Sequence, residues 1–269
     1  EDTSADEFEQ LIRTNLLGTA NAARAALPRL EESGGGAFIA VSSIEGIRAL
    51  PYQSAYSAAK HGMDGLLESL RAEGLQENRK VVISQILPSS IDTPLFEHAR
   101  TRIGVRPKGF PPLYSPRLVA RAIAHAAEHP TRRLIVGGAG RVLATLEGFV
   151  PGAVDVFLTL LGRAGQRTRQ PKRPSDPDNL YEPLDFDHRV EGNSRRHGRE
   201  WSLYTAWALS RWSRPATAAL LLGAGLLAAN ALRRSRAGRE EAFASDEEGP
   251  RLVRARYVRP SEREPLKNV

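Results

Sequence analysis

Tyr56 and Lys60 have the clearest potential for chemistry, because they stand four positions apart in a stretch with helical character. At that spacing two side chains lie on one face of a helix, about one turn apart. Tyrosine has an ordinary pKa of about 10 and carries protons poorly at neutral pH, whereas a neighbouring ammonium favours the phenolate and lowers that pKa. Ser43 ends a short apolar run and can reach the same point. These three groups could hold the oxygen of a carbonyl or alcohol and transfer its proton, while the hydride would need another donor.

Two elements must position these side chains. Residues 37–43 form a short apolar run after three glycines, which predicts a buried strand that ends at Ser43. Residues 54–73 have leucines at helical spacing, with Ser54 able to cap the start of the helix and Gly74 able to end it. Tyrosine and lysine at this spacing are also common on solvated helix faces, so the pair alone leaves a surface location open.

The neighbouring residues favour the chemical interpretation. Ser43 stands thirteen positions before Tyr56 and is followed by Ile-Glu-Gly, and Tyr56 begins the run Tyr-Ser-Ala-Ala-Lys. This arrangement closely resembles the short-chain dehydrogenase/reductase family, and the resemblance covers about residues 1–160.

The resemblance implies a role for each of these residues. Tyr56 is then the general acid or base, and Ser43 orients the substrate oxygen. Lys60 lowers the pKa of Tyr56 and holds the ribose of the nicotinamide cofactor, which is NAD or NADP. Asn15 stands where the family has a fourth catalytic residue and would hold a water that links Lys60 to solvent. An asparagine in the middle of a helix is otherwise a polar surface residue.

The segment after the next predicted strand, 81–87, reads Pro-Ser-Ser-Ile-Asp-Thr-Pro. It looks like the family's segment that contacts the nicotinamide. The resemblance therefore implies cofactor contacts from Pro88, Ser89, Ile91 and Thr93, in addition to those from Tyr56 and Lys60. The family's usual glycine after the proline is Ser89 here, which restricts the backbone beside the cofactor.

A long, proline-rich loop continues from this segment to Pro116, and loops of this length are often lids. The resemblance implies that it covers the substrate, a small carbonyl compound or alcohol. Leu95, Phe96 and Phe110 are then substrate contacts beside Ser43. The alternative, that these three side chains only pack within the lid, stays open.

The expected fold class is α/β, the C-terminal portion of a doubly wound, Rossmann-like parallel sheet with a helical C-terminal extension. The remaining elements are expected as a helix at 5–31, a strand at 133–137, a helix from Ser115 to about His129, and a helical stretch at 141–161 that breaks at Pro151-Gly152. The glycines at 137–140 lack the G-x-G-x-x-G spacing, which predicts a turn rather than a phosphate cradle.

The resemblance also implies four earlier strands and a glycine-rich turn that seats the cofactor pyrophosphate at a helix N-terminus. We therefore expect residues 1–162 to be the catalytic part of the domain without its N-terminal cofactor-binding strands, and to be inactive alone. The alternative is a non-catalytic, membrane-tethered remnant that binds a partner.

Composition excludes several other classes of protein. The sequence has no cysteine, so it forms no disulfide and no thiolate metal site. The net charge of +7 raises the question of nucleic acid, but the arginines occur without any recognisable nucleic-acid module, so no nucleic-acid partner is expected. His125 and His129 have a spacing that suits a metal but lack a clear third ligand, so no metal site is expected.

The C-terminal part divides by composition into a linker, expected to be disordered, at 163–200, a hydrophobic helical segment at 201–236 and a charged tail, also expected to be disordered, at 237–269. The uncharged run 215–232 follows three tryptophans and precedes arginines, features of a membrane anchor. A helix docked on the enzyme or a partner is the alternative. We expect a cytoplasmic catalytic part, held at the membrane by this helix, and a homo-oligomer formed through helices 5–31 and 54–73.

Overall fold

The computed structural model describes residues 2–173, 175–185, 188–193, 198–210, 213, 215, 219, 222–227 and 229–231. The chain divides into two compact units, residues 1–213 and residues 214–269. All the helices and strands named below belong to the first unit.

Three parallel strands form the central sheet, β1 (Gly36–Val41), β2 (Val81–Pro88) and β4 (Arg133–Val136), in the order β1-β2-β4. The register aligns Val41 with Ile86, and Pro88 with Val136, so the carboxyl ends of the strands lie along one edge. The α/β, Rossmann-like fold class expected from the sequence is thereby confirmed.

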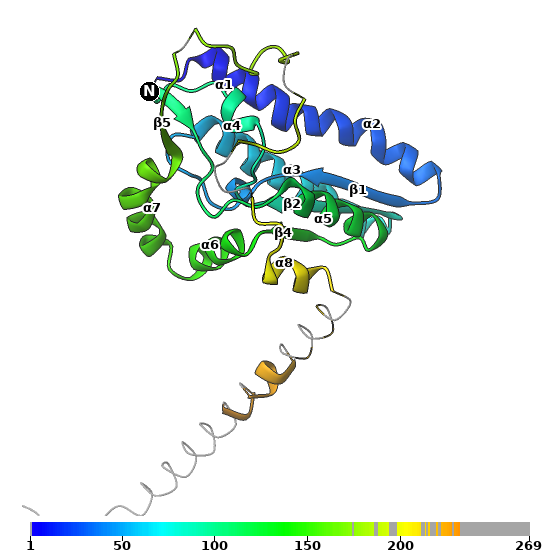
Figure 1. The fold of residues 1–269 in the computed structure, drawn as a ribbon. Helices are drawn as coiled ribbons and strands as arrows, with labels where there is room; N and C mark the ends of the chain where they lie inside the picture. Colours follow the sequence, from blue (N-terminus) through cyan, green and yellow to red (C-terminus); the bar gives the residue numbers. More distant parts are fainter. Residues whose placement is uncertain are drawn as a thin grey trace, which may run out of the picture. The chain divides into compact units, whose positions relative to one another are not determined.

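Helices cover both faces of this sheet (Figure 1). The helix α3 (Ser54–Gln76) packs through Leu67 on Ile83 of β2, whereas α5 (Pro116–Glu128) packs through Ala122 on Ile86 of the same strand. Successive side chains of a strand point to opposite faces, so an apolar strand with helices on both sides is buried on both sides. The covered faces leave the edges of the sheet as the places where a substrate could reach its residues.

The predicted N-terminal helix is present in three parts, α1 (Ala5–Ile12), the π-helical turn η1 (Arg13–Leu17) and α2 (Gly18–Glu32). Ser4 and Glu7 cap one another at its start, as the sequence predicts. Pro28 lies inside α2 and does not end it. The π turn contains Asn15, and such turns often mark functional positions.

The ends of α3 differ from the prediction. Gln53 is the residue before the helix and Ser54 its first residue, so Ser54 does not cap it. Gly74 lies within the helix, which ends at Gln76. The left-handed backbone that turns the chain falls at Asn78 (φ 54°), because asparagine tolerates that conformation better than other non-glycine residues.

The remaining elements surround the carboxyl edge of the sheet. They are the 3-10 turn η2 (Ile44–Gly46), α4 (Leu95–His98), β3 (Val105–Pro107), α6 (Gly138–Phe149), α7 (Pro151–Gln166), β5 (Arg167–Pro171) and α8 (Leu203–Ala208). Pro151 occupies the first turn of α7, which confirms the expected break.

The segment 163–200, expected to be a disordered linker, contributes ordered structure to the first unit. It contains the end of α7 and β5, which pairs antiparallel with β3. Further along, the backbone N–H of Gly192 donates to Asp92 O and that of Arg199 to Leu113 O. These backbone contacts dock the segment on the loop that leads from β2 to α5, which its polar composition does not indicate. Residues 174, 186–187 and 194–197 of the segment lie outside the described residues.

Within the described part of the chain no helix is both long and apolar enough to cross a membrane. The run 215–232 is described only at scattered positions, which are helical, so the anchor expected there has no support from the structure. The tail 237–269 lies outside the described residues.

Candidate active site

Ser43 and Tyr56 converge where β1 ends and α3 begins. The side chain of Ser43 caps η2, with its Oγ accepting the backbone N–H of Glu45 at 3.1 Å. The same hydroxyl lies near the phenol of Tyr56 and lowers the pKa of that tyrosine. Because Ser43 Oγ accepts the hydrogen bond of the Glu45 N–H, its own O–H remains available as a donor.

Lys60 is buried beside this pair. Its Nζ lies 5.6 Å from the centroid of the Tyr56 ring and donates to Val41 O at 3.1 Å. Burial lowers the pKa of Lys60, and the carboxylates of Asp64 and Glu45 raise it. Two acidic groups therefore support the ammonium against the cost of burial.

The pKa of Tyr56 is raised to about 12, by burial and by the charge of Glu45, against the lowering effect of the Ser43 hydrogen bond. The expected lowering of this pKa by Lys60 stays a prediction. The ammonium lies over the ring and is bonded to Val41 O, and burial of the phenol has the largest effect on its pKa.

Glu45 is a member of the site that the sequence analysis did not single out. It is buried and accepts a hydrogen bond from Ser57 Oγ at 2.7 Å. Burial raises its pKa to about 7, although hydrogen bonds from Ser57 and the Leu50 backbone and the charge of Lys60 each lower it. One sequence feature could have pointed to Glu45. It is a carboxylate two residues after Ser43, between the predicted strand 37–43 and the predicted helix 54–73.

Asn15 lies on a helix that runs along α3, with Leu16 packed against Gly62, where an added Cβ would come within 2.9 Å of the leucine. The amide Nδ2 of Asn15 donates to Leu11 O at 3.1 Å, inside its own helix. The structure thus places Asn15 on the expected element, and its link through water to Lys60 stays a prediction.

The segment expected to contact the nicotinamide extends β2 along the carboxyl edge. The Ser89 N–H donates to Val136 O at 2.9 Å, Ile91 bridges Tyr114, and the Thr93 N–H donates to Ile91 O at 3.1 Å. These bonds hold Pro88 to Thr93 beside the end of β4, on the edge that also carries Ser43.

The three candidate substrate contacts differ in their surroundings. Leu95 is exposed on α4. Phe96 packs against Gly109, where an added Cβ would lie 3.0 Å from its ring. The Phe110 ring contacts Phe157 of α7 edge-on, with 5.8 Å between centroids. Phe96 and Phe110 therefore have packing partners within and beside the loop, and Leu95 is the most open of the three.

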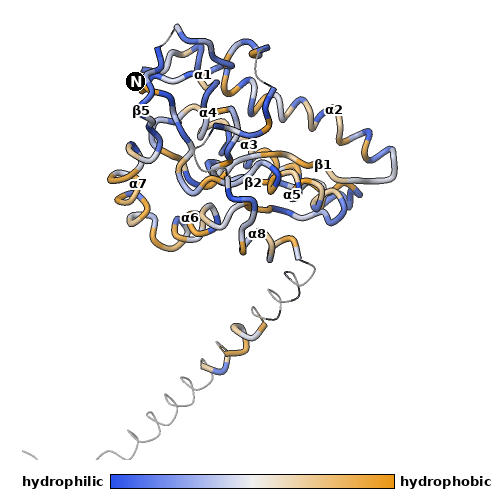
Figure 2. Tube along the Cα trace, viewed as in Figure 1, coloured by the Kyte–Doolittle hydropathy of each residue, from blue (hydrophilic) through white to orange (hydrophobic). Residues whose placement is uncertain are grey.

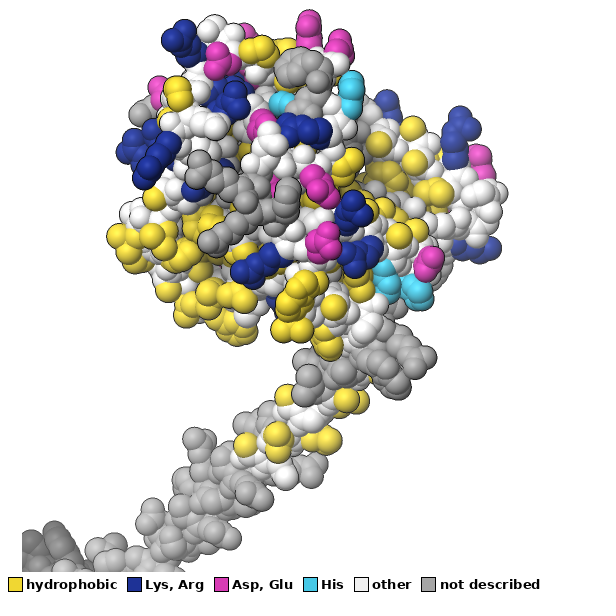
Figure 3. Space-filling view, viewed as in Figure 1, with side chains coloured by type: hydrophobic (Ala, Val, Ile, Leu, Met, Phe, Trp, Pro, Cys, Tyr) yellow, Lys and Arg dark blue, Asp and Glu magenta, His cyan; other side chains and the backbone are white. Residues whose placement is uncertain are grey.

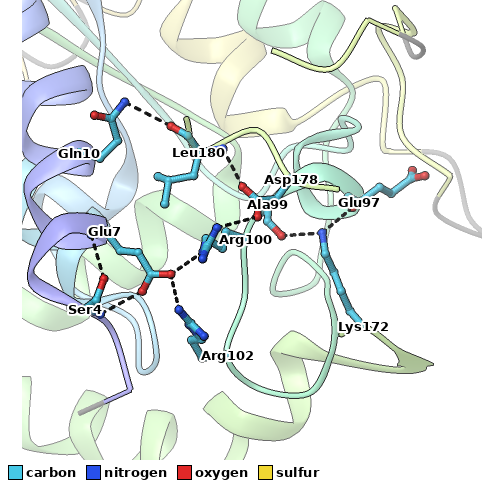
Figure 4. Close-up of polar contacts among 10 residues, drawn as sticks. All are labelled: Ser4, Glu7, Gln10, Glu97, Ala99, Arg100, Arg102, Lys172, Asp178 and Leu180. Carbon is cyan, nitrogen blue, oxygen red and sulfur yellow. Dashed lines mark hydrogen bonds and ion pairs between the residues drawn. The ribbon is translucent and has the colours of Figure 1, made fainter. Parts of the chain in front are cut away.

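The loop after α4 is fastened to α1 by one buried carboxylate (Figure 4). Glu7 pairs with both Arg100 and Arg102, and Arg100 also bonds Asp178 at 3.2 Å. Burial by itself raises the pKa of Glu7, but the Ser4 backbone and the two guanidinium groups lower it to about 2. Lys172 closes the cluster by donating to the Ala99 carbonyl at 2.8 Å.

The glycines at 137–140, expected as a turn, instead begin a helix, because Gly137 precedes α6 and Gly138 is its first residue. The N–H of Gly137 donates to Thr205 Oγ1 at 2.9 Å, that of Gly138 to Ser202 Oγ at 3.1 Å, and that of Ala139 to the Tyr114 hydroxyl at 3.1 Å. The donors that a phosphate would need are thus used by the protein itself.

His125 lies in the last turn of α5, and His129 directly follows the helix. The rings of His125 and His129 stack with 4.8 Å between centroids. Across the described residues, no group of histidine, aspartate or glutamate side chains is arranged to hold a metal ion.

The donors at this edge suit the nicotinamide end of a dinucleotide. Lys60 Nζ can donate three hydrogen bonds and uses one on Val41 O and a weak one on Met63 Sδ. It therefore keeps a donor for a ribose hydroxyl. The sequence has no G-x-G-x-x-G loop for the phosphates, so these residues fit only the nicotinamide end.

Three comparisons place the chain among known proteins. The family model described as short chain dehydrogenase matches residues 1–104. The uncharacterised oxidoreductase YxnA of Bacillus subtilis is 30% identical over 237 residues, covering 87% of this chain and 65% of that protein. The uncharacterised oxidoreductase Lin0452 of Listeria innocua is 33% identical over 130 residues, covering 46% of this chain and 52% of that protein.

Among solved structures, a short chain dehydrogenase from Burkholderia cenocepacia in complex with NADP is 29% identical, with a TM-score of 0.45. The match covers 55% of this chain and 56% of that one. The chain thus spans about two thirds or less of the length of these relatives.

The parallel sheet, with Ser43 and Tyr56 beside the buried Lys60 at its carboxyl edge, agrees with the fold expected of such proteins. The matched residues make the chain similar to the short-chain dehydrogenase/reductase family.

Proposed function

We propose that this chain supplies the acid–base half of an NAD(P)-dependent enzyme that interconverts a carbonyl compound and a secondary alcohol. The observation that carries the proposal is the position of Ser43 and Tyr56 at the carboxyl edge of the sheet, with the Lys60 ammonium 5.6 Å from the centre of the tyrosine ring. Oxidoreduction in general follows from the family, whereas the reaction and the residue roles are proposed from this geometry.

Tyr56 acts as the proton donor in the direction of carbonyl reduction. Its raised pKa, about 12, keeps the phenol protonated at neutral pH, so it can protonate an alkoxide oxygen as negative charge develops there. Ser43 holds the same oxygen through its hydroxyl, which the Glu45 N–H orients. A bound nicotinamide cofactor supplies or accepts the hydride.

Glu45 is a positioning residue in this scheme. Its carboxylate opposes ionisation of Tyr56 and favours the ammonium form of Lys60. Ionised Glu45 thus keeps the proton on the phenol until a substrate oxygen takes it. Because the pKa of Glu45 is about 7, this influence changes across neutral pH.

Replacing Tyr56 in a catalytically active form of the protein tests the proposal. Tyr56→Phe keeps the ring and removes the proton, so turnover with carbonyl substrates and NADH or NADPH should fall about 10²-fold or more. Tyr52→Phe is the matched control, because Tyr52 lies four positions earlier and is 61% exposed. Near-normal turnover in Tyr56→Phe would exclude Tyr56 as the acid.

A further inference from the structure

The helices α6 and α7 expose large apolar side chains along most of their length. Phe149 is 83% exposed and Leu160 is 72% exposed. The full set, called the α6–α7 surface below, is Val142, Leu146, Phe149, Val150, Val156, Phe157, Leu160 and Leu161. Figure 2 shows both helices largely in orange, and Figure 3 shows yellow side chains gathered over them. Apolar surface of this extent usually marks an interaction site.

The acidic residues of these helices are paired. α6 and α7 contain one acidic residue each, Glu147 and Asp155. Arg48 bonds Glu147 at 3.2 Å and also pairs with Asp155. The α6–α7 surface is therefore apolar and carries no net negative charge from its own helices.

Basic side chains border the surface at the end of α7. They lie on the paired strands β3 and β5 and on the residues directly after them. This set, called the basic ribbon, is Arg106, Lys108, Arg167, Arg169 and Arg173. In Figure 3 dark blue side chains lie on the same side of the molecule as the yellow surface. An apolar face bordered by cations is the pattern that anionic lipid surfaces select.

Contacts with the active-site side of the domain hold α7 in place. Gly162 lies against Pro51, where an added Cβ would come within 3.1 Å, and Gln166 Nε2 donates to Pro51 O at 3.1 Å. The amide of Gln53 donates to Gln166 at 2.6 Å. The α6–α7 surface is thus a fixed feature of the fold, joined to the residues that lead into α3.

We propose that the α6–α7 surface docks on an anionic lipid bilayer, with the basic ribbon against the headgroups. A second copy of the chain is a weaker candidate, because a two-fold contact through this surface would bring two basic ribbons toward each other. The proposal does not depend on the proposed function or on the run 215–232.

A fluorescent label on the surface tests this docking in the full chain. The sequence has no cysteine, so Phe149→Cys accepts a single NBD group. With vesicles of phosphatidylcholine and phosphatidylglycerol, its emission should shift to the blue and be quenched by doxyl-labelled lipid. Leu75→Cys is the matched control, because Leu75 is also apolar, is 75% exposed and lies on α3. That label should remain unchanged.

The charge component has its own test. Arg167→Gln and Arg169→Gln should each weaken binding to anionic vesicles about fivefold, and vesicles of phosphatidylcholine alone should bind less. Leu160→Cys provides a second label position if Phe149→Cys does not fold. The proposal is overturned if both labels stay unshifted while the chain sediments with vesicles, because the membrane contact then lies elsewhere. It is also overturned if the labels shift without lipid as protein concentration rises, which would indicate a second copy.

Discussion

The backbone N–H of Glu45 donates to the hydroxyl of Ser43 at 3.1 Å. Through this bond the residue that carries a buried carboxylate also orients the hydroxyl of Ser43. One short turn after β1 therefore influences both the geometry and the charge of the candidate site.

Glu45→Gln should lower the pKa of Tyr56 below its value of about 12, because the substitution removes a negative charge that opposes the phenolate. The phenol can be titrated by NMR with ¹³C-labelled tyrosine, and the Tyr56→Phe spectrum assigns its signal. This readout needs no activity. Glu73→Gln is the control, because Glu73 is exposed on α3, the helix that carries Tyr56. It should leave the titration of Tyr56 unchanged. An unaltered Tyr56 pKa in Glu45→Gln would remove Glu45 from the proposed scheme.

The free energy of unfolding should fall as pH rises from about 4.5 to about 7, through Glu45. Its pKa is higher in the folded chain, about 7, than the ordinary 4.5, so the folded state binds the proton more strongly in that window. Linkage limits the effect to about 3 kcal/mol. Urea unfolding at pH 5 and pH 8 measures this change in the free energy of unfolding, and the change should be smaller in Glu45→Gln. An equal change in the original protein and in Glu45→Gln would contradict the raised pKa of Glu45.

Glu7→Gln should detach the loop after α4 from α1, because Arg100 and Arg102 lose their shared carboxylate. The expected loss is about 1–3 kcal/mol, with faster hydrogen exchange at residues 98–104. The pKa of Glu7 is lowered to about 2, so its contribution is present above pH 4.5 and is lost as pH falls toward 2. Glu9→Gln serves as control, since Glu9 pairs with Arg13 on the exposed side of α1.

Gly137→Ala should destabilise the domain by about 1–3 kcal/mol. Gly137 has φ 105°, and an added Cβ would lie 2.7 Å from the Tyr114 ring and 2.9 Å from Ser89. Gly148→Ala, within α6 and with open space around it, should be neutral or stabilise by up to about 1 kcal/mol. Thermal unfolding of the two variants compares them, and equal stability would mean that the turn relaxes freely.

Local patterns in the sequence predicted the strands, the helices and the shared helix face of Tyr56 and Lys60. Strand 81–88 is an apolar run buried on both faces, and the four-residue spacing of Tyr56 and Lys60 fixes their shared helix face. Such features depend on neighbours within a few residues. The predicted end of α3 at Gly74 was wrong, because the helix continues to Gln76.

Burial and long-range pairing were decided only by the tertiary structure. Glu45 acquires a pKa of about 7 because α3 packs over it, and the pKa of Tyr56 rises for the same reason. Thr205, far along the chain, accepts the N–H of Gly137. The polar segment before it, expected as a linker, bonds the loop between β2 and α5. Spacing along a chain shows which groups can meet, but their protonation depends on how much water the complete fold removes from them.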